Sequence, residues 1–86
     1  MEFDEGEHYR FMDRLKEIAK FENANVSKID GLRVDYEDGF GLIRPSNTTP
    51  ILVLRFEADS QEAIARIQAD FKSAIRLVDE HIPTPF

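Results

Sequence analysis

The sequence predicts an α+β domain made of a helix, an antiparallel sheet of four strands and a second helix. Apolar residues repeat at helical spacing near both ends of the chain, whereas apolar and polar residues alternate between them. Pairs of Asp and Gly interrupt the alternating region, which is typical of tight turns between neighbouring strands. With 86 residues we expect a single domain, residues 1–86, with both helices on one face of the sheet.

The first helix is predicted to follow the polar segment 1–6. Asp4 and Glu7 have the spacing of a capping box, and the helix is expected to stop near residues 22–23. One stripe of this helix has apolar residues at helical spacing: Phe11 or Met12, Leu15, Ile18 and Ala19. His8 is expected to be solvent-exposed or locally bonded rather than a metal ligand.

Three strands are predicted next, joined by tight turns. A short strand at 26–29 leads to a two-residue turn at Asp30-Gly31, and a second such turn at Asp38-Gly39 makes segment 40–43 antiparallel to its predecessor. The strand between these turns alternates apolar and charged residues, with one buried set: Leu32, Val34 and Tyr36. Gly41 indicates either a bulge or a close approach of another element, and both alternatives stay open.

The fourth strand is predicted at 51–57 and the second helix directly after it. Both faces of this strand begin with apolar residues, so Ile51 and Val53 could form a contact surface. Asp59 and Glu62 have the spacing of another capping box. The helix then has a long apolar stripe: Ile64, Ile67, Phe71, Ala74, Ile75 and Val78. We interpret this stripe as core.

The charge of the chain excludes several kinds of partner. A formal net charge of -6 and a pI near 4.8 argue against nucleic acid and anionic membrane surfaces, which need clustered Lys and Arg. The absence of cysteine excludes disulfides and thiolate zinc sites. No segment has the pattern of a signal peptide or a membrane span, so we expect a cytoplasmic protein, monomeric as an isolated domain.

A polar loop at residues 44–50 separates the third and fourth strands. Arg44 carries a planar fork of donors that suits the paired oxygens of phosphate or carboxylate. Ser46, Asn47 and Thr48 add two hydroxyls, an amide and backbone N–H groups that can converge on an anion. Prolines on both sides stiffen the backbone. The loop therefore favours an oxyanion site, although an ordinary surface loop contains the same residue types.

Three segments carry a family signature: Asp30-Gly31-Leu32-Arg33-Val34-Asp35, Gly39-Phe40-Gly41-Leu42-Ile43-Arg44-Pro45-Ser46-Asn47-Thr48-Thr49-Pro50, and Leu54-Arg55-Phe56-Glu57-Ala58. They resemble the last domain of the α-D-phosphohexomutases, most closely that of the bacterial bifunctional phosphomannomutase/phosphoglucomutases. The resemblance extends to Phe86 and implies a fold similar to the TATA-box-binding protein. It also implies a chain that is one domain of a larger mutase.

The resemblance further implies the reaction. Such enzymes move a phosphoryl group between the 1 and 6 positions of a hexose through a phosphoserine, and the last domain grips the phosphate that is not transferred. Hexose 1-phosphate, hexose 6-phosphate and the remaining domains of the same enzyme are then the partners. Magnesium and the phosphoserine belong to the other domains, so we expect no cofactor, no metal and no catalytic residue in this chain. The isolated chain is expected to be inactive.

The resemblance assigns the phosphate contacts residue by residue, to Arg44, Ser46, Asn47, Thr48 and, more weakly, Thr49. Thr49 is the weaker candidate because many members carry Glu there. The carboxylates of Asp35, Glu37 and Glu57 are expected to be solvated strand positions rather than a general acid/base pair. Two other classes stay open, a free-standing phosphosugar-binding module and a protein-interaction module that uses the apolar surface around Ile51 and Val53.

Overall fold

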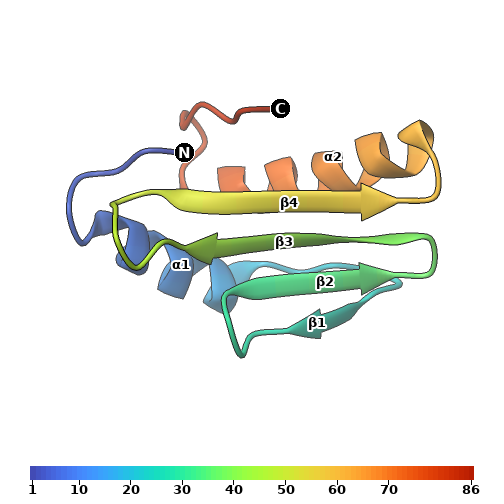
Figure 1. The fold of residues 1–86 in the computed structure, drawn as a ribbon, viewed down its shortest axis with the longest axis horizontal. Coiled ribbons are helices and arrows are strands. Elements are labelled where there is room, and N and C mark those ends of the chain that lie inside the picture. The colour runs from blue at the N-terminus through green and yellow to red at the C-terminus, as the bar shows by residue number, and fades with distance from the viewer.

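The computed structural model describes all residues 1–86. The elements follow in the order α1 (Glu7–Ile18), β1 (Asn25–Ser27), β2 (Leu32–Tyr36), β3 (Gly39–Pro45), β4 (Leu52–Ala58) and α2 (Gln61–Val78). The strands form one antiparallel sheet in the order β1-β2-β3-β4, so each strand pairs with its neighbour in the sequence (Figure 1). The predicted α+β class and the meander of four strands are confirmed.

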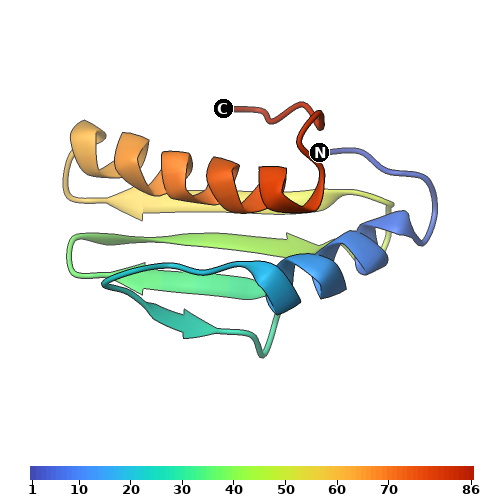
Figure 2. The same ribbon diagram turned by 180° about the vertical axis from the view of Figure 1, so that it is seen from behind.

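Both helices lie on one face of the sheet and leave the other face open (Figures 1 and 2). The core fills the space between these two layers, and its largest fully buried side chains come from both: Phe71, Met12, Leu15, Leu32, Ile43, Ile67, Ile75 and Val34. The predicted stripe of α2 is therefore core at Ile67, Phe71, Ala74 and Ile75. None of the helices is both long enough and apolar enough to cross a membrane.

Gly41 marks a close approach and no bulge. The register of β3 with both neighbours is continuous through this residue, from Val34 on one side to Phe56 on the other. A Cβ atom built on Gly41 would lie 2.4 Å from Cε1 of Phe71, which is far inside van der Waals contact. The missing side chain therefore lets the Phe71 ring of α2 rest directly on the sheet.

The two predicted turns are displaced. Tyr36 pairs with Gly39, so the tight turn between β2 and β3 is Glu37-Asp38 rather than Asp38-Gly39. Ser27 pairs with Arg33, so the first connection is longer than the two residues predicted. Its Gly31 has φ 89°, and a Cβ there would lie 2.5 Å from the Ile43 carbonyl oxygen. Gly31 is thus needed for close packing against β3, which sequence spacing alone does not reveal.

Both predicted capping boxes were wrong. At α1 the N-cap is Gly6 with φ 86° and no side-chain hydrogen bond, and Asp4 contributes only its backbone oxygen, 2.9 Å from the Glu7 nitrogen. At α2 the N-cap is Ser60, whose Oγ accepts a hydrogen bond from the Ala63 nitrogen at 3.1 Å. Ser60 and Asp59 are both good capping residues, and only the backbone position decides between them.

The first helix is also shorter than predicted, since it ends at Ile18 rather than near residues 22–23. Ala19 is already extended, with φ -69° and ψ 138°. The chain then turns so that the ring of Phe21 packs on Phe71, with ring centroids 5.1 Å apart. Burial of this aromatic side chain against α2 competes with continuation of the helix and prevails.

Candidate functional site

The loop that joins β3 to β4 lies at one end of the sheet, together with the N-terminal segment and the first turn of α1 (Figure 1). The N-terminal segment runs beside the end of the loop and forms an isolated antiparallel bridge there, between Glu2 and Ile51. The Phe3 nitrogen donates to the Pro50 oxygen at 2.8 Å, and the Leu52 nitrogen donates to the Met1 oxygen at 2.9 Å. The far end of the loop is therefore fixed by a segment that precedes it by almost fifty residues.

The near end of the loop is closed by its own backbone. The Ser46 nitrogen donates to the Ile51 oxygen at 3.0 Å, and the Ile51 nitrogen donates to the Thr49 oxygen at 2.8 Å. Because proline fixes φ and has no N–H, Pro45 and Pro50 limit the conformations of the chain on either side. The loop is thus a closed turn with little freedom at its ends.

Hydrogen-bond donors of the loop converge on the hydroxyl of Ser46. Its Oγ accepts from the backbone nitrogens of Thr48 at 3.3 Å and of Thr49 at 3.4 Å, and from the Thr49 hydroxyl at 3.3 Å. The Thr48 hydroxyl lies 3.3 Å from the same atom. Backbone N–H groups that point into one concavity form an anion-binding nest. Three of the predicted loop residues, Ser46, Thr48 and Thr49, are therefore brought together around one point.

Asn47 has donors that no group of the chain uses. Neither its backbone N–H nor its side-chain amide makes a hydrogen bond within the chain, and the residue is exposed. Exposed donors of this kind bind water in the free protein and can exchange that water for a ligand oxygen.

Arg44 is the penultimate residue of β3 and is paired with Val53 of β4. Its side chain lies on the open face of the sheet, because Ile43 before it points into the core. A Cβ on Gly31 would lie 2.6 Å from the Arg44 Cβ, so the backbone of β3 at this residue is seated against that glycine. The predicted site arginine thus stands on rigid sheet backbone, beside the loop.

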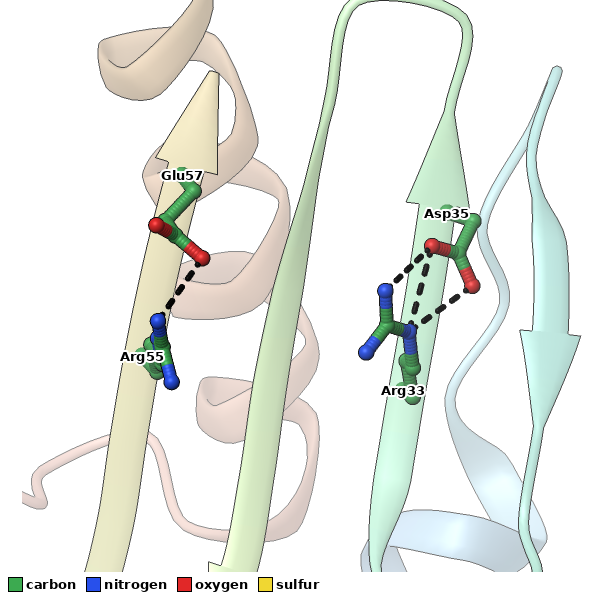
Figure 3. Close-up of polar contacts among 4 residues, drawn as sticks. All are labelled: Arg33, Asp35, Arg55 and Glu57. Carbon is green, nitrogen blue, oxygen red and sulfur yellow. Dashed lines mark hydrogen bonds and ion pairs between the residues drawn. The ribbon is translucent and has the colours of Figure 1, made fainter.

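Arg44 differs from the other two arginines of the sheet in having no carboxylate partner. Arg33 pairs with Asp35 at 3.0 Å, and Arg55 pairs with Glu57 at 3.1 Å, in each case two residues along the same strand (Figure 3). The position two residues after Arg44 is occupied by Ser46. The guanidinium of Arg44 makes no hydrogen bond or ion pair within the chain. In a chain of net charge -6, this leaves one unneutralised cation on the sheet.

Arg33 and Arg55 have bonds to a carboxylate that Arg44 lacks. The hydrogen bonds from Arg33 to the Asp35 carboxylate raise the pKa of the guanidinium above its ordinary value, because they favour the charged form. A ligand phosphate would supply the same kind of bond to Arg44.

His8 is buried beneath the loop and contacts a residue 38 positions away, so it is neither solvent-exposed nor locally bonded as predicted. The residue is 4% exposed, and its Nε2 lies 3.3 Å from the carbonyl oxygen of Ser46. The hydroxyl of the neighbouring Tyr9 donates to the same oxygen at 3.4 Å. A sequence signal was available, because His8 continues the helical spacing of Phe11 and Leu15 and therefore lies on the buried stripe.

A separate hollow lies at the opposite end of the sheet, near the turn between β2 and β3, and four of its polar side chains form two pairs. The Tyr36 hydroxyl donates to Asp70 Oδ2 at 2.9 Å, and burial, with this bond, raises the pKa of Tyr36. Arg66 lies beside Asp38 and lowers the pKa of that carboxyl. No group of three or more His, Cys, Asp or Glu side chains in residues 1–86 could hold a metal ion.

Fold and site together define a class: an α+β domain with a helix-covered antiparallel sheet that carries a polar loop and an unpaired arginine at one end. Residues 7–74 match the family model described as phosphoglucomutase/phosphomannomutase, C-terminal domain. The chain therefore belongs to the family of C-terminal domains of phosphoglucomutases and phosphomannomutases.

Individual relatives agree with this assignment. The chain is 44% identical over 82 residues to a phosphomannomutase/phosphoglucomutase of Pseudomonas aeruginosa, covering 95% of this chain and 18% of that protein. It is 62% identical over 68 residues to a phosphoglucomutase of Neisseria meningitidis serogroup B, covering 78% of this chain and 15% of that protein. The chain thus spans less than a fifth of the length of the curated relatives it matches.

A solved structure supports the same family. The chain superposes with a TM-score of 0.87 and 52% identity on a crystal structure of a phosphoglucomutase/phosphomannomutase family protein from Burkholderia thailandensis. The match covers 92% of this chain and 18% of that one.

Proposed function

We propose that this chain is the phosphate-gripping domain of a larger phosphomannomutase/phosphoglucomutase. In this role it holds the phosphate of the hexose phosphate that is not transferred, while a phosphoryl group moves between the 1 and 6 positions through a phosphoserine in another domain. Arg44, Ser46, Asn47 and Thr48 make the phosphate contacts, and Thr49 is a weaker candidate for a further contact. The full-length enzyme acts on hexose 1-phosphates and hexose 6-phosphates in the cytoplasm.

The observation that carries the proposal is the unpaired guanidinium of Arg44 beside a loop of convergent donors. The two other arginines of the sheet are neutralised by carboxylates of their own strands. Leaving one cation unpaired next to Ser46 and the free N–H of Asn47 has no evident benefit for stability. It does suit a phosphate dianion, which takes two parallel bonds from an arginine and further bonds from N–H and O–H groups.

The substrate must bind in two orientations if either phosphate is to be transferred. The anchor therefore has to recognise a phosphate and not a particular sugar, and donors aimed at phosphate oxygens meet that need. Selectivity among hexoses then comes from other domains.

Catalysis by the isolated chain is not expected. Asp35 and Glu57, the carboxylates of the open face, are held in ion pairs with arginines of their own strands. We assign the phosphoserine and the magnesium to the other domains of the enzyme. Turnover of glucose 1-phosphate by the isolated chain in a mutase assay would contradict this part of the proposal.

The test is an amide-resolved NMR titration of the isolated chain with glucose 1-phosphate, mannose 1-phosphate, inorganic phosphate and free glucose. We expect shifts concentrated at residues 44–49 with all three phosphorylated ligands and none with glucose. Binding in the millimolar range is expected, since a small ligand held by a few hydrogen bonds gains roughly 4 kcal/mol. Equal responses to glucose and to phosphate, or shifts centred elsewhere, would contradict a phosphate site.

Arg44→Ala is the matched variant and Arg76→Ala its control, because Arg76 is an exposed arginine of α2 that has no ion pair. Loss of a charge-assisted hydrogen bond of roughly 1.5–3 kcal/mol should weaken phosphate binding about ten- to a hundredfold in Arg44→Ala. The control removes the same charge and should change binding by less than about twofold. In a full-length enzyme that ends in this chain, the same factor should appear in kcat/KM.

A further inference from the structure

His8 is the only buried residue of this chain with a polar side chain. Its imidazole is 4% exposed, and its Nδ1 atom has no hydrogen-bond partner. An unsatisfied buried polar atom lowers stability, and an apolar side chain of similar size at this position would avoid that loss. A residue that costs stability where Phe, Leu or Met would fit needs another reason to be there.

The contact made by the other ring nitrogen supplies the reason. Nε2 lies 3.3 Å from the carbonyl oxygen of Ser46, which can only accept. Nε2 therefore carries a proton, and the ring donates to the loop. The Tyr9 hydroxyl donates to the same oxygen at 3.4 Å, and the two rings lie against each other with centroids 4.0 Å apart.

The two hydrogen bonds that hold the Ser46 carbonyl in one direction also determine the direction of the Asn47 N–H group. The peptide unit between Ser46 and Asn47 is planar and trans, as are all peptide bonds of the chain, so its N–H points away from its C=O. The carbonyl is directed towards α1 by two donors, and the N–H of Asn47 is consequently directed away from α1. This is the N–H that makes no bond within the chain.

We propose that His8 and Tyr9 are positioning residues that clamp the Ser46 carbonyl and thereby present the Asn47 N–H to a phosphate oxygen. This inference rests on the proposed phosphate-binding function, and it adds two residues of α1 that do not themselves touch the ligand. Without the clamp the Ser46–Asn47 peptide can rotate, and the site must be ordered each time a phosphate binds.

The variants separate positioning from folding. Tyr9→Phe deletes one donor from a side chain that is 45% exposed, so the fold should tolerate it. His8→Phe deletes the other donor and keeps an aromatic ring in the core. His8→Gln should restore function, because its side-chain amide can donate to the same carbonyl. Tyr36→Phe is the matched control, since it deletes a tyrosine hydroxyl that bonds Asp70 at the opposite end of the sheet.

The first readout needs no ligand. In the free chain, ¹⁵N relaxation and hydrogen exchange of the Asn47 amide should show a more mobile and faster exchanging group in Tyr9→Phe and His8→Phe than in the unmodified chain. The unmodified chain and Tyr36→Phe should be alike. Ring ¹⁵N shifts of His8 should show a protonated Nε2. An unchanged Asn47 amide in both clamp variants would overturn the proposal, as would an Nε2 atom without a proton.

The second readout is titration with glucose 1-phosphate. Loss of either donor should weaken binding roughly three- to tenfold, and loss of both should weaken it more, while His8→Gln and Tyr36→Phe stay within about twofold. Equal weakening in Tyr36→Phe would show a general structural effect and overturn the proposal. A failure of the unmodified chain to respond to phosphate would count against the proposed function, while the mobility of the Asn47 amide would still test the clamp.

Discussion

At the scale of single residues, Gly41 controls how closely helix and sheet approach. Its neighbours across the sheet are Val34 and Phe56, and the ring of Phe71 occupies the space that a side chain would need. Phe71 is 1% exposed and also contacts Phe21 and Phe56, so it has nowhere to move. The absence of a side chain at Gly41 therefore lets Phe71 pack at the centre of the core.

Gly41→Ala should destabilise the chain by about 1–3 kcal/mol, because a methyl group must displace a ring in a close-packed core. Unfolding by urea measures the change. If the clash with Phe71 is the cause, the double variant with Phe71→Leu should lose less than the sum of the single losses, by about 0.5 kcal/mol or more. Strict additivity of the two losses would show that Gly41 is needed for another reason.

At the scale of elements, the two helices begin in different ways. α2 begins with Ser60, whose hydroxyl satisfies the Ala63 nitrogen, whereas α1 begins after a glycine in the left-handed region and has no side-chain cap. The start of α1 is held instead by tertiary contacts of its first turn with the loop. One helix is thus begun by local sequence and the other by its place in the fold.

Ser60→Ala should lower the free energy of unfolding by about 1 kcal/mol through loss of the cap. Asp4→Ala is its matched control, because Asp4 precedes α1 at the predicted cap and its side chain makes no hydrogen bond. We expect the control to change stability by less than about 0.5 kcal/mol. Thermal unfolding of both variants side by side gives the comparison, and equal losses would mean that Asp4 does contribute to the start of α1.

At the scale of the whole molecule, the open face of the sheet combines apolar and charged rows. Phe40 and Leu42 of β3 lie in the middle, and the ion pairs of β2 and β4 flank them (Figure 3). The guanidinium of Arg33 lies 4.2 Å from the ring centroid of Phe40 and covers part of it. Charged residues on an uncovered sheet face oppose association with other copies.

The isolated chain should therefore stay monomeric in sedimentation velocity from roughly 10 μM to 1 mM, whether or not phosphate is present. A variant in which Thr replaces the four flanking charged residues keeps good strand formers and exposes the apolar row, so it should self-associate. The four residues replaced are Arg33, Asp35, Arg55 and Glu57. The control variant has Thr in place of the four residues of two exposed ion pairs of α1, and it should stay monomeric. These residues are Glu7, Arg10, Arg14 and Glu17. Self-association of the unmodified chain would favour an interaction module instead.

The sequence by itself determined the order of elements, the apolar stripes and the chemistry of the loop. These features depend on local periodicity and residue type, which need no knowledge of distant contacts. The β2–β3 turn was misplaced by one residue because both candidate pairs contain a good turn residue, and only strand pairing selects between them. The phosphate role of residues 44 and 46–49 stays a prediction.

The tertiary structure decided which groups reach the loop and which do not. Arg44 has Ser46 two residues after it in place of a carboxylate, and the sheet register places Val53 beside it, so no neighbouring strand supplies the missing partner. Gly41 is a close approach because Phe71 of α2 packs against the sheet at that residue. His8 meets Ser46 across 38 positions of sequence. Such contacts depend on how the layers pack, so the local pattern identified the residue types of the site, and the packing of α1 decided what holds them in place.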